Sequence, residues 1–374
     1  MKQALFTMKI SLRILLSFTI CTAAAVAFGQ VTDSTYTGPA SGNWSDPANW
    51  TPSLVPNNGG GRTFDITIDG VRVQLDLDVT ISNLNLNSDG SRLVDNVHLF
   101  HALNTTVGDG FVELTGTGTV NLGNLADFSD HTLNSGSYTV DANVPGQVAK
   151  LQFNGADIVN NYGLIRFLGP DARLEDENGN NALAHLALNG ADSLLRLGYG
   201  SNLSLGTDFH NQGQLILRQG STITFGGAYT SMGTGDNGLL EFYGTDTGAR
   251  SGNSNVMVTG NFGNQDASGV LSGQFFIWAY GAGTATLQYN DANITDLTGD
   301  LLLQGPHARI VDQYGNDGLR NLAANHSLDF GMQFGARTQN ISGSFANDGF
   351  FALVGDAQVN VAGNFTSTVN LTLD

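Results

Sequence analysis

The sequence contains almost no cysteine and few positively charged residues. Cys21 is the only cysteine among 374 residues, so the chain can form no internal disulfide and must be stabilised by burial and hydrogen bonding. Lysine and arginine together number 15 against 33 acidic residues. The resulting net charge of −18 argues against binding to nucleic acid or to anionic membranes, both of which attract basic patches.

Long hydrophobic runs are absent except at the N-terminus, where residues 1–29 have the form of a secretory signal peptide. Lys2, Lys9 and Arg13 form a basic region, an apolar run follows at 14–20, and small residues at 23–29 suit a cleavage site. Ile20 is too large to precede a lipidated cysteine, which argues against a lipoprotein. We therefore expect a secreted protein without a membrane span.

What the sequence does contain is glycine, asparagine and short alternating segments. Glycine accounts for 49 residues, and 41% of all residues are hydrophobic. Phe64, Ile66 and Ile68 alternate with polar residues before Gly70, and the same rhythm continues along the chain. Period-two alternation between glycine and asparagine turns predicts many short, half-buried strands.

The chain also repeats itself 136 residues apart, without a gap. The segment 151–154 (LQFN) returns as 287–290 (LQYN), and 169–173 (GPDAR) returns as 305–309 (GPHAR). The register holds as far as Thr230 and Thr366. A long internal period is typical of solenoids, and this one fits about six coils of roughly 22 residues.

These patterns predict an all-β fold, specifically a right-handed parallel β-solenoid (β-helix) with an N-terminal cap. Residues 181–187 and 317–323 carry apolar residues at helical spacing, so each long repeat should contain one short helical turn. The expected organisation is a signal peptide at 1–29, a cap at 30–61, first coils at 62–133, repeat copy one at 134–269 and an incomplete copy two at 270–374. The incomplete copy leaves open whether the natural chain continues past Asp374.

Two motifs carry a family resemblance. One is the segment 42–50 (GNWSDPANW) with Val55-Pro56, and the other is the unit at 169–187 with its later Phe-x-Asn-x-Gly. Together they resemble repetitive secreted surface proteins of bacteria, which often end in a Pro-Glu-Pro sorting tail known as PEP-CTERM. The resemblance implies a β-solenoid at the cell surface and says little about activity. No sorting tail is present in this sequence, which leaves attachment to the surface open.

Two groups of residues are candidates for binding. Trp44 and Trp50 could stack on a sugar ring, but an aromatic cap on the open end of the first coil is the favoured interpretation. Arg173 and Arg309 precede Asp176 and Asp312 by three residues in the two copies. These pairs could form an anion or sugar-hydroxyl site displayed twice, although structural clamps are favoured.

A metal or cofactor has little support in the sequence. Asp176, Asn178 and Asn180 have the oxygen-rich look of a calcium loop, but the second copy places Tyr314 at the position of Asn178, so an Asx-rich turn is favoured. The seven histidines show no metal-binding spacing. No cofactor is expected apart from this weak calcium alternative.

Catalytic motifs are not recognisable. Four acids are candidates for a polysaccharide-degrading site, namely Asp76, Asp78, Glu113 and Glu175, but the sequence does not place them on one face. We expect a non-catalytic structural or interaction protein of the bacterial exterior, adhesin-like or part of a matrix, with extracellular polysaccharide or other surface components as partners. The alternatives are a carbohydrate-active β-helix enzyme, such as a polysaccharide lyase or glycoside hydrolase, and a non-catalytic glycan-binding protein.

Overall fold

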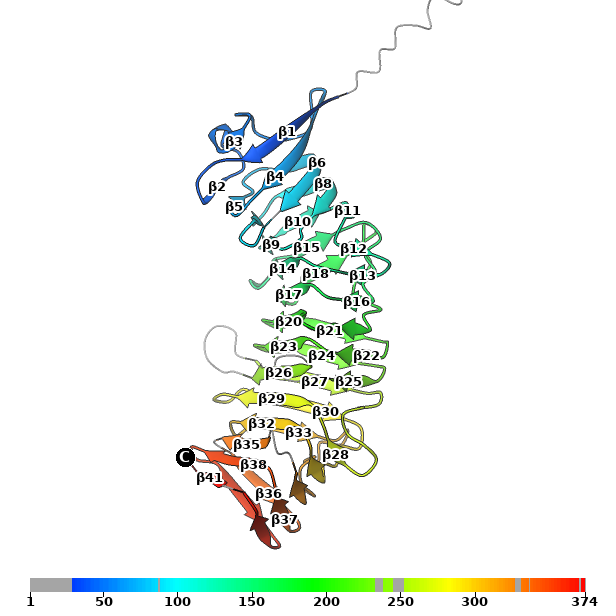
Figure 1. Ribbon diagram of the computed structural model, residues 1–374, viewed down its shortest axis with the longest axis vertical. Helices are drawn as coiled ribbons and strands as arrows, with labels where there is room; N and C mark the ends of the chain where they lie inside the picture. The colour runs from blue at the N-terminus through cyan, green and yellow to red at the C-terminus, as the bar shows by residue number, and fades with distance from the viewer. Residues whose placement is uncertain are drawn as a thin grey trace, which may run out of the picture.

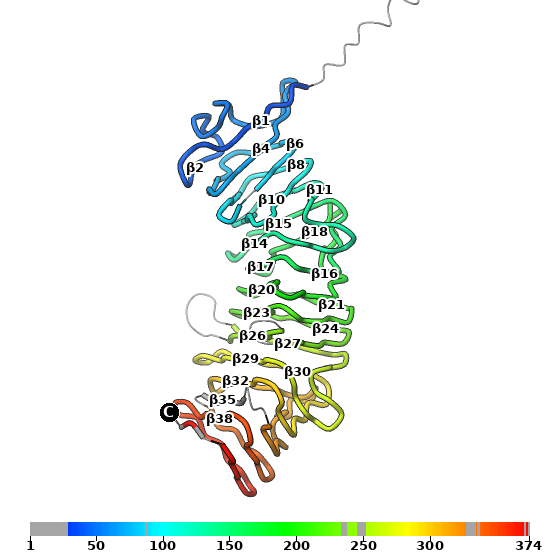
Figure 2. The backbone as a smooth tube through the Cα atoms, viewed as in Figure 1, coloured from blue at the N-terminus to red at the C-terminus, as the bar shows by residue number. Residues whose placement is uncertain are grey.

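The computed structural model describes residues 29–86, 88–232, 238–244, 252–326, 331–335, 337–369 and 371–373. All of the predicted signal peptide except Gly29 lies outside these residues. The described chain forms a long stack of coils, with its first strands at one end and its last strand at the other (Figures 1 and 2). No helix among the described residues is long and apolar enough to cross a membrane.

The coils have up to three sides, which we call face 1, face 2 and face 3, and the coils before residue 128 contribute strands to faces 1 and 2 only. Face 1 is one sheet of 14 parallel strands. Its strands are β2 (Ser41–Asn43), β5 (Arg72–Gln74), β7 (Arg92–Asp95), β9 (Phe111–Thr115), β14 (Ser137–Asp141), β17 (Leu164–Leu168), β20 (Leu194–Gly198), β23 (Gln214–Arg218), β26 (Leu239–Gly244), β29 (Gln274–Ala279), β32 (Asp300–Gln304), β35 (Gly331–Gly335), β38 (Phe350–Val354) and β41 (Leu371–Leu373).

Face 2 is divided into three sheets. The first sheet holds β1 (Gln30–Tyr36), β3 (Trp50–Thr51), β4 (Arg62–Ile68), β6 (Val79–Leu86), β8 (Leu99–Thr106), β10 (Gly118–Asn121), β11 (Asn124–Leu125), β15 (Ala149–Gln152) and β18 (Ala172–Glu175). The second holds β21 (Asn202–Leu205), β24 (Thr222–Phe225), β27 (Ser254–Val258), β30 (Ala285–Tyr289) and β33 (Ala308–Val311). The third holds β36 (Thr338–Ile341) and β39 (Gln358–Val361).

Face 3 consists of very short strands. They are β12 (Phe128–Ser129), β13 (Thr132–Leu133), β16 (Asn160–Asn161), β19 (Leu188–Asn189), β22 (Phe209–Asn211) and β25 (Tyr229–Ser231), then β28 (Val270–Leu271) with β31 (Asp296–Leu297), and β34 (Ala324–Asn325) with β37 (Phe345–Asn347) and β40 (Phe365–Ser367). The only helical element among the described residues is a 3₁₀ turn, η1 (Pro47–Asn49). The predicted parallel β-solenoid is therefore confirmed.

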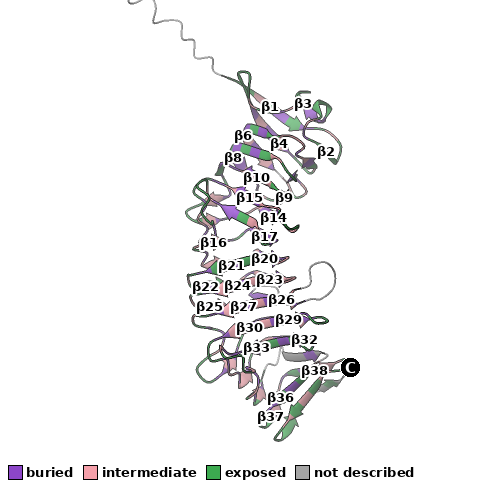
Figure 3. Cartoon of the chain, turned by 180° about the vertical axis from the view of Figure 1, so that it is seen from behind, coloured by how far each residue is buried: buried purple, intermediate pink, exposed green. Residues whose placement is uncertain are grey.

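The core is the interior of the coils. Buried residues alternate with more exposed ones along many strands, as the period-two pattern predicts, and Figure 3 colours the chain by this burial. The buried residues of one coil are in register with those of the next. On face 1 one such buried column runs through Val112, Tyr138, Ile165, Leu195, Leu215, Leu240, Phe275 and Leu301. Burial of this continuous column between neighbouring coils is the main stabilising contribution that a chain without disulfides has available.

Face 3 contributes a buried polar column. Asn161 Nδ2 donates to Asn189 Oδ1 at 2.9 Å, and Asn189 Nδ2 donates to Asn211 Oδ1 at 2.9 Å. All three side chains are fully buried. Each amide satisfies the next, so the column fixes the register of the coils without leaving buried polar groups unpaired.

The two copies of the long repeat follow the same path. Strands β15 to β25 recur one by one as β30 to β40, and the segments starting at Leu151 and Leu287 lie in equivalent strands. The number of coils corrects the sequence estimate. On face 1 the register partners on successive strands are Ser137, Leu164, Leu194, Gln214, Leu239 and Gln274. The five steps between them span one period, so the period holds five coils rather than six. The loops between the strands differ in length, so the coils contain different numbers of residues. An estimate based on one coil length of roughly 22 residues therefore gave too many coils.

The expected helical turn is present as two successive turns rather than a helix. Ala184 N–H donates to Asn181 O at 3.2 Å and Leu186 N–H donates to Leu183 O at 3.2 Å, both with i→i+3 spacing. The second copy repeats these bonds at Arg320 and Leu322. Leu183 and Leu186 are fully buried by this arrangement.

Candidate functional site

The two N-terminal tryptophans lie inside the cap. Trp44 and Trp50 are 0% and 2% exposed, and their ring centroids lie 4.7 Å apart. Trp44 Nε1 donates to Pro56 O and Trp50 Nε1 donates to Trp44 O, both at 2.8 Å. β3 pairs antiparallel with β1 and so covers the outer edge of face 2. Because neither ring has an open face, these residues are placed to close the solenoid rather than to stack on a sugar.

The structure corrects the predicted arginine–aspartate pairs. Arg173 Nη2 lies 3.4 Å from Asp171 Oδ1, and its side chain is 50% exposed. Arg309 Nε donates to Thr286 Oγ1 at 3.4 Å and is also exposed. Both arginines point outward from β18 and β33, whereas the aspartates lie in the turns that follow these strands. Neither arginine is therefore the buried clamp that the sequence favoured.

Asp176 instead organises its own turn. Its Oδ1 accepts from the backbone N–H groups of Asn178 and Asn180 at 2.8 and 2.7 Å, and its Oδ2 accepts from Asn180 Nδ2 at 2.7 Å. Asp312 accepts in the same way from Tyr314 and Asn316. Hydrogen bonds, led by that of the Asn180 side chain, lower the pKa of Asp176. This arrangement is an Asx turn that is complete without a cation.

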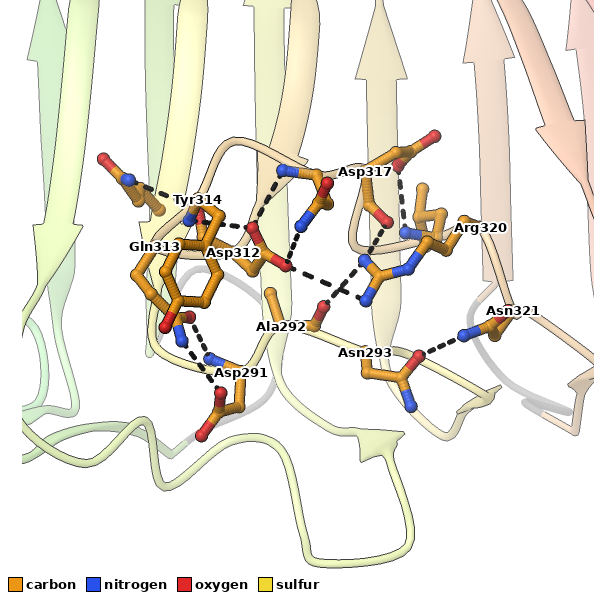
Figure 4. A network of polar contacts seen from close by, with 12 residues as sticks. Asp291, Ala292, Asn293, Asp312, Gln313, Tyr314, Asp317, Arg320 and Asn321 are labelled. Atoms are coloured by element: carbon orange, nitrogen blue, oxygen red, sulfur yellow. Dashed lines mark hydrogen bonds and ion pairs between the residues drawn. The ribbon is translucent and has the colours of Figure 1, made fainter.

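The second copy does contain an arginine clamp, at a different position. Arg320 Nη1 donates to Asp317 O at 2.6 Å and to Ala292 O at 3.4 Å, and Arg320 Nη2 lies 3.8 Å from Asp312 Oδ2 (Figure 4). Alanine stands at the matching position 184 of the first copy. The clamp thus belongs to one copy only, and the Asx turn is the element that both copies share.

The same turn interrupts face 2 in both copies. Asp176 N–H donates to Asn180 O and Ala182 N–H donates to Leu174 O, each at 2.9 Å, so the turn folds back against the end of β18. The first sheet of face 2 ends there, and β21 begins a new sheet. The equivalent turn in the second copy separates β33 from β36. We call these two interruptions the first notch and the second notch.

A polar groove lies on face 2 near the N-terminal end. Asp33, Asp65, Asn83, Asn104 and Asn124 form one column in register across β1, β4, β6, β8 and β11. Thr35, Thr67, Asn85 and Thr106 form a second column beside it. The groove between the columns has a volume of about 490 Å³. With strands about 4.8 Å apart, the first column extends for about 19 Å along the solenoid.

The groove contains two neighbouring carboxylates and a chain of hydrogen-bonded asparagines. Asp33 and Asp65 are direct neighbours on parallel strands, and like charges in that position destabilise each other. Within the described part of the chain, no donor lies within hydrogen-bonding distance of the buried Asp65 Oδ1. The asparagines are linked in sequence, since Asn104 donates to Asn83 and Asn124 donates to Asn104. The coil-length spacing of these asparagines is the signal in the sequence from which this column could be found.

The acids that the sequence singled out are not brought together. Glu113 lies in β9 on face 1, and Glu175 lies in β18 on face 2. Asp76 accepts from Ser45, and Asp78 accepts from Leu99 N–H, so both stabilise turns between coils. The structure therefore assembles no catalytic group from these four residues.

Sequence reasoning also missed an aromatic column on face 1. Arg218, Tyr243 and Trp278 occupy one register position in β23, β26 and β29. The two aromatic rings are stacked with centroids 4.5 Å apart, and the Arg218 guanidinium lies 4.6 Å from the Tyr243 centroid. The stacked rings cover each other, and the guanidinium covers Tyr243, so this column resembles a structural ladder more than a sugar platform.

Histidines and carboxylates meet on the side of face 3. His131 and His185 both lie beside Asp157, at 3.2 and 2.8 Å. His326 lies 2.6 Å from Asp296. No group of three or more potential metal ligands occurs among the described residues. Comparison with protein-family models, with curated proteins and with solved structures gives no match, so the groove and the notches are interpreted from their own geometry.

Proposed function

We propose that this protein is a secreted, non-catalytic scaffold of the bacterial exterior that binds an extracellular polysaccharide in the polar groove of face 2. The observation that carries the proposal is the pair of parallel columns, which present carboxylates, amides and hydroxyls at one spacing along the axis. Sugar hydroxyls both donate and accept hydrogen bonds, so an extended glycan chain can pair with the acceptors and donors of both columns. The net charge of −18 favours neutral glycans over anionic ones.

Binding assays with neutral extracellular polysaccharides test the proposal. Asn104→Leu and Thr67→Val remove polar groups from the two columns, and we expect each to weaken binding at least about tenfold. Asn360→Ala is the matched control, because Asn360 donates to Asn340 at 2.9 Å in an exposed pair outside the groove. Equal binding by the wild type and both groove variants would remove the groove from the proposal.

A carbohydrate-active enzyme is the second candidate, favoured by the neighbouring carboxylates of Asp33 and Asp65. The two carboxyl groups of retaining glycosidases stand about 5–5.5 Å apart, which is close to the spacing of strands in a sheet. Shortening of the polysaccharide during the binding assay, abolished by Asp65→Asn, would identify the groove as an active site and replace the scaffold proposal.

A further inference from the structure

The second notch is filled by an arginine of the chain itself. Arg337 Nη1 donates to Ala308 O at 2.6 Å, and Arg337 Nη2 donates to Gln339 Oε1 at 2.6 Å. Its guanidinium lies 5.3 Å from the centroid of Phe334. Gln339 Nε2 in turn donates to Asp317 Oδ2 at 2.9 Å. The guanidinium thus occupies the gap between β33 and β36 and satisfies a carbonyl at the interrupted strand edge.

Arg337 enters the second notch as a cation. Burial lowers its pKa to about 10, and the negative charge of Asp317 opposes that shift. The side chain is therefore protonated at neutral pH. A planar group with donors on its edge and apolar faces suits a notch that has carbonyl acceptors and an aromatic wall.

The first notch lacks this arginine. Ser201 stands at the position of Arg337, and its Oγ lies within 3.1 Å of the carbonyl oxygens of Phe167, Gly169 and Gly198. A cavity of about 270 Å³ is left between β18 and β21. Ala172, the counterpart of Ala308, lines this cavity. In the second notch Arg337 donates to Ala308 O. In the first notch the equivalent residue, Ala172, borders an open cavity instead.

The lining of the first notch suits the same chemistry. Phe167, Leu174 and Leu203 supply apolar walls, and the carboxylate of Glu175 lies where the second copy has Val311. Glu175 is 5% exposed, so a ligand that reaches it is largely removed from water.

The cations around the first notch are already paired. Lys150 Nζ lies 3.8 Å from Glu175 Oε2, and Gln152 Nε2 donates to the same oxygen at 3.2 Å, so the other oxygen, Oε1, is the one that an incoming guanidinium would use. Arg173 lies 3.4 Å from Asp171. The chain as a whole carries a net charge of −18, which attracts basic segments of a partner.

We propose that the first notch binds an arginine side chain presented by another protein, in the position that Arg337 occupies in the second notch. The incoming guanidinium donates to Ala172 O and to the Glu175 carboxylate, and its face packs on the apolar wall. This site lies apart from the polar groove and does not depend on glycan binding. It gives the scaffold a second kind of partner, a protein segment with an accessible arginine.

Titration with blocked tripeptides tests the proposal. The probe is N-acetyl-Gly-Arg-Gly-amide, and the matched probes carry citrulline or lysine in place of arginine. We expect the arginine peptide to shift the NMR signals of residues around Ala172 and to bind at least about tenfold more tightly than either analogue. Equal binding of arginine and citrulline, or no binding of arginine, would overturn the proposal.

Exchanging the two notches gives an independent test. Ser201→Arg with Leu203→Gln copies the second notch into the first, and we expect arginine-peptide binding to be lost. Arg337→Ser with Gln339→Leu opens the second notch, Val311→Glu supplies the carboxylate that Glu175 provides in the first, and we expect this triple variant to gain a second binding site. Glu175→Gln keeps the shape of the first notch and should weaken binding of the arginine peptide at least about tenfold. This single variant still tests the proposal if an exchanged variant does not fold. Unchanged binding by Glu175→Gln and by the filled variant would contradict the assignment.

Discussion

At the scale of single residues, burial decides what a polar side chain does in this protein. Asn189 and Asn124 both belong to asparagine columns with one residue per coil. Asn189 is fully buried, bonded to Asn161 and Asn211, and also accepts from Ser193 Oγ at 2.8 Å. Asn124 is exposed, and water can replace its bond to Asn104. The same ladder is therefore structural on face 3 and available for ligands in the groove.

Replacing Asn189 by alanine should be strongly destabilising. The change removes the hydrogen bonds from Asn161 Nδ2 and Ser193 Oγ and leaves the buried side-chain oxygen of Asn211 without the donor that Asn189 supplies. We expect a loss of about 3 kcal/mol in the free energy of unfolding, measured with urea. Asn124→Ala is the control and should change it by less than about 0.5 kcal/mol. Similar losses in both variants would show that the buried column is not specially stabilising.

At the scale of elements, the Asx turns determine where face 2 is interrupted, and they also couple the fold to pH. Asp176 and Asp312 have pKa values below the usual 3.8 in the folded protein. For Asp312 burial acts to raise the pKa, but the hydrogen bonds from Asn316 and Tyr314 outweigh it. A pKa depressed by folding adds stability above the unfolded value, and that stability is lost as the pH falls through the folded value.

The turns should therefore make the protein sensitive to acid. We expect the free energy of unfolding to fall below about pH 4, and Asp176→Asn with Asp312→Asn to flatten this fall. Asp95 is the contrasting case, since burial raises its pKa despite a hydrogen bond from His98 N–H, and its contribution to the pH dependence has the opposite sign. Urea unfolding at several acidic pH values measures the slopes. An unchanged slope in the double variant would mean that other carboxylates control the acid response.

The elements also show how far sequence reasoning reaches. Alternation at Phe64, Ile66 and Ile68 and the gapless repeat predicted strands and coils, because stacking places similar residues at similar positions. Trp44 and Trp50 predicted the cap. The partners of Arg173 were not predictable, since an outward side chain can turn toward several neighbours. The notch was missed because it depends on how the turn after Glu175 folds back. The groove was missed because Asp33 and Asp65 meet only through strand register, which spacing alone does not reveal.

At the scale of the whole molecule, the coils form a linear stack in which each contacts mainly its neighbours. Stability should then be local, and damage at one end should not reach the other. Trp44 is the strongest test, because it is fully buried in the cap and its ring centroid lies 6.0 Å from that of Phe100 in β8. Removing this ring leaves a cavity in the cap and should cost about 3–5 kcal/mol.

Hydrogen exchange of Trp44→Ala separates local from global effects. We expect amides of β1 to β8 to lose protection, while those of β20 to β32 keep the wild-type values, because no contact of the cap reaches that far along the stack. Phe242→Ala is the matched core variant, since Phe242 is fully buried in β26, and its effect should centre on β23 to β29. A uniform loss of protection along the chain in Trp44→Ala would mean that the stack unfolds as one cooperative unit. Local loss would instead leave the groove at the capped end dependent on the cap and the notches independent of it.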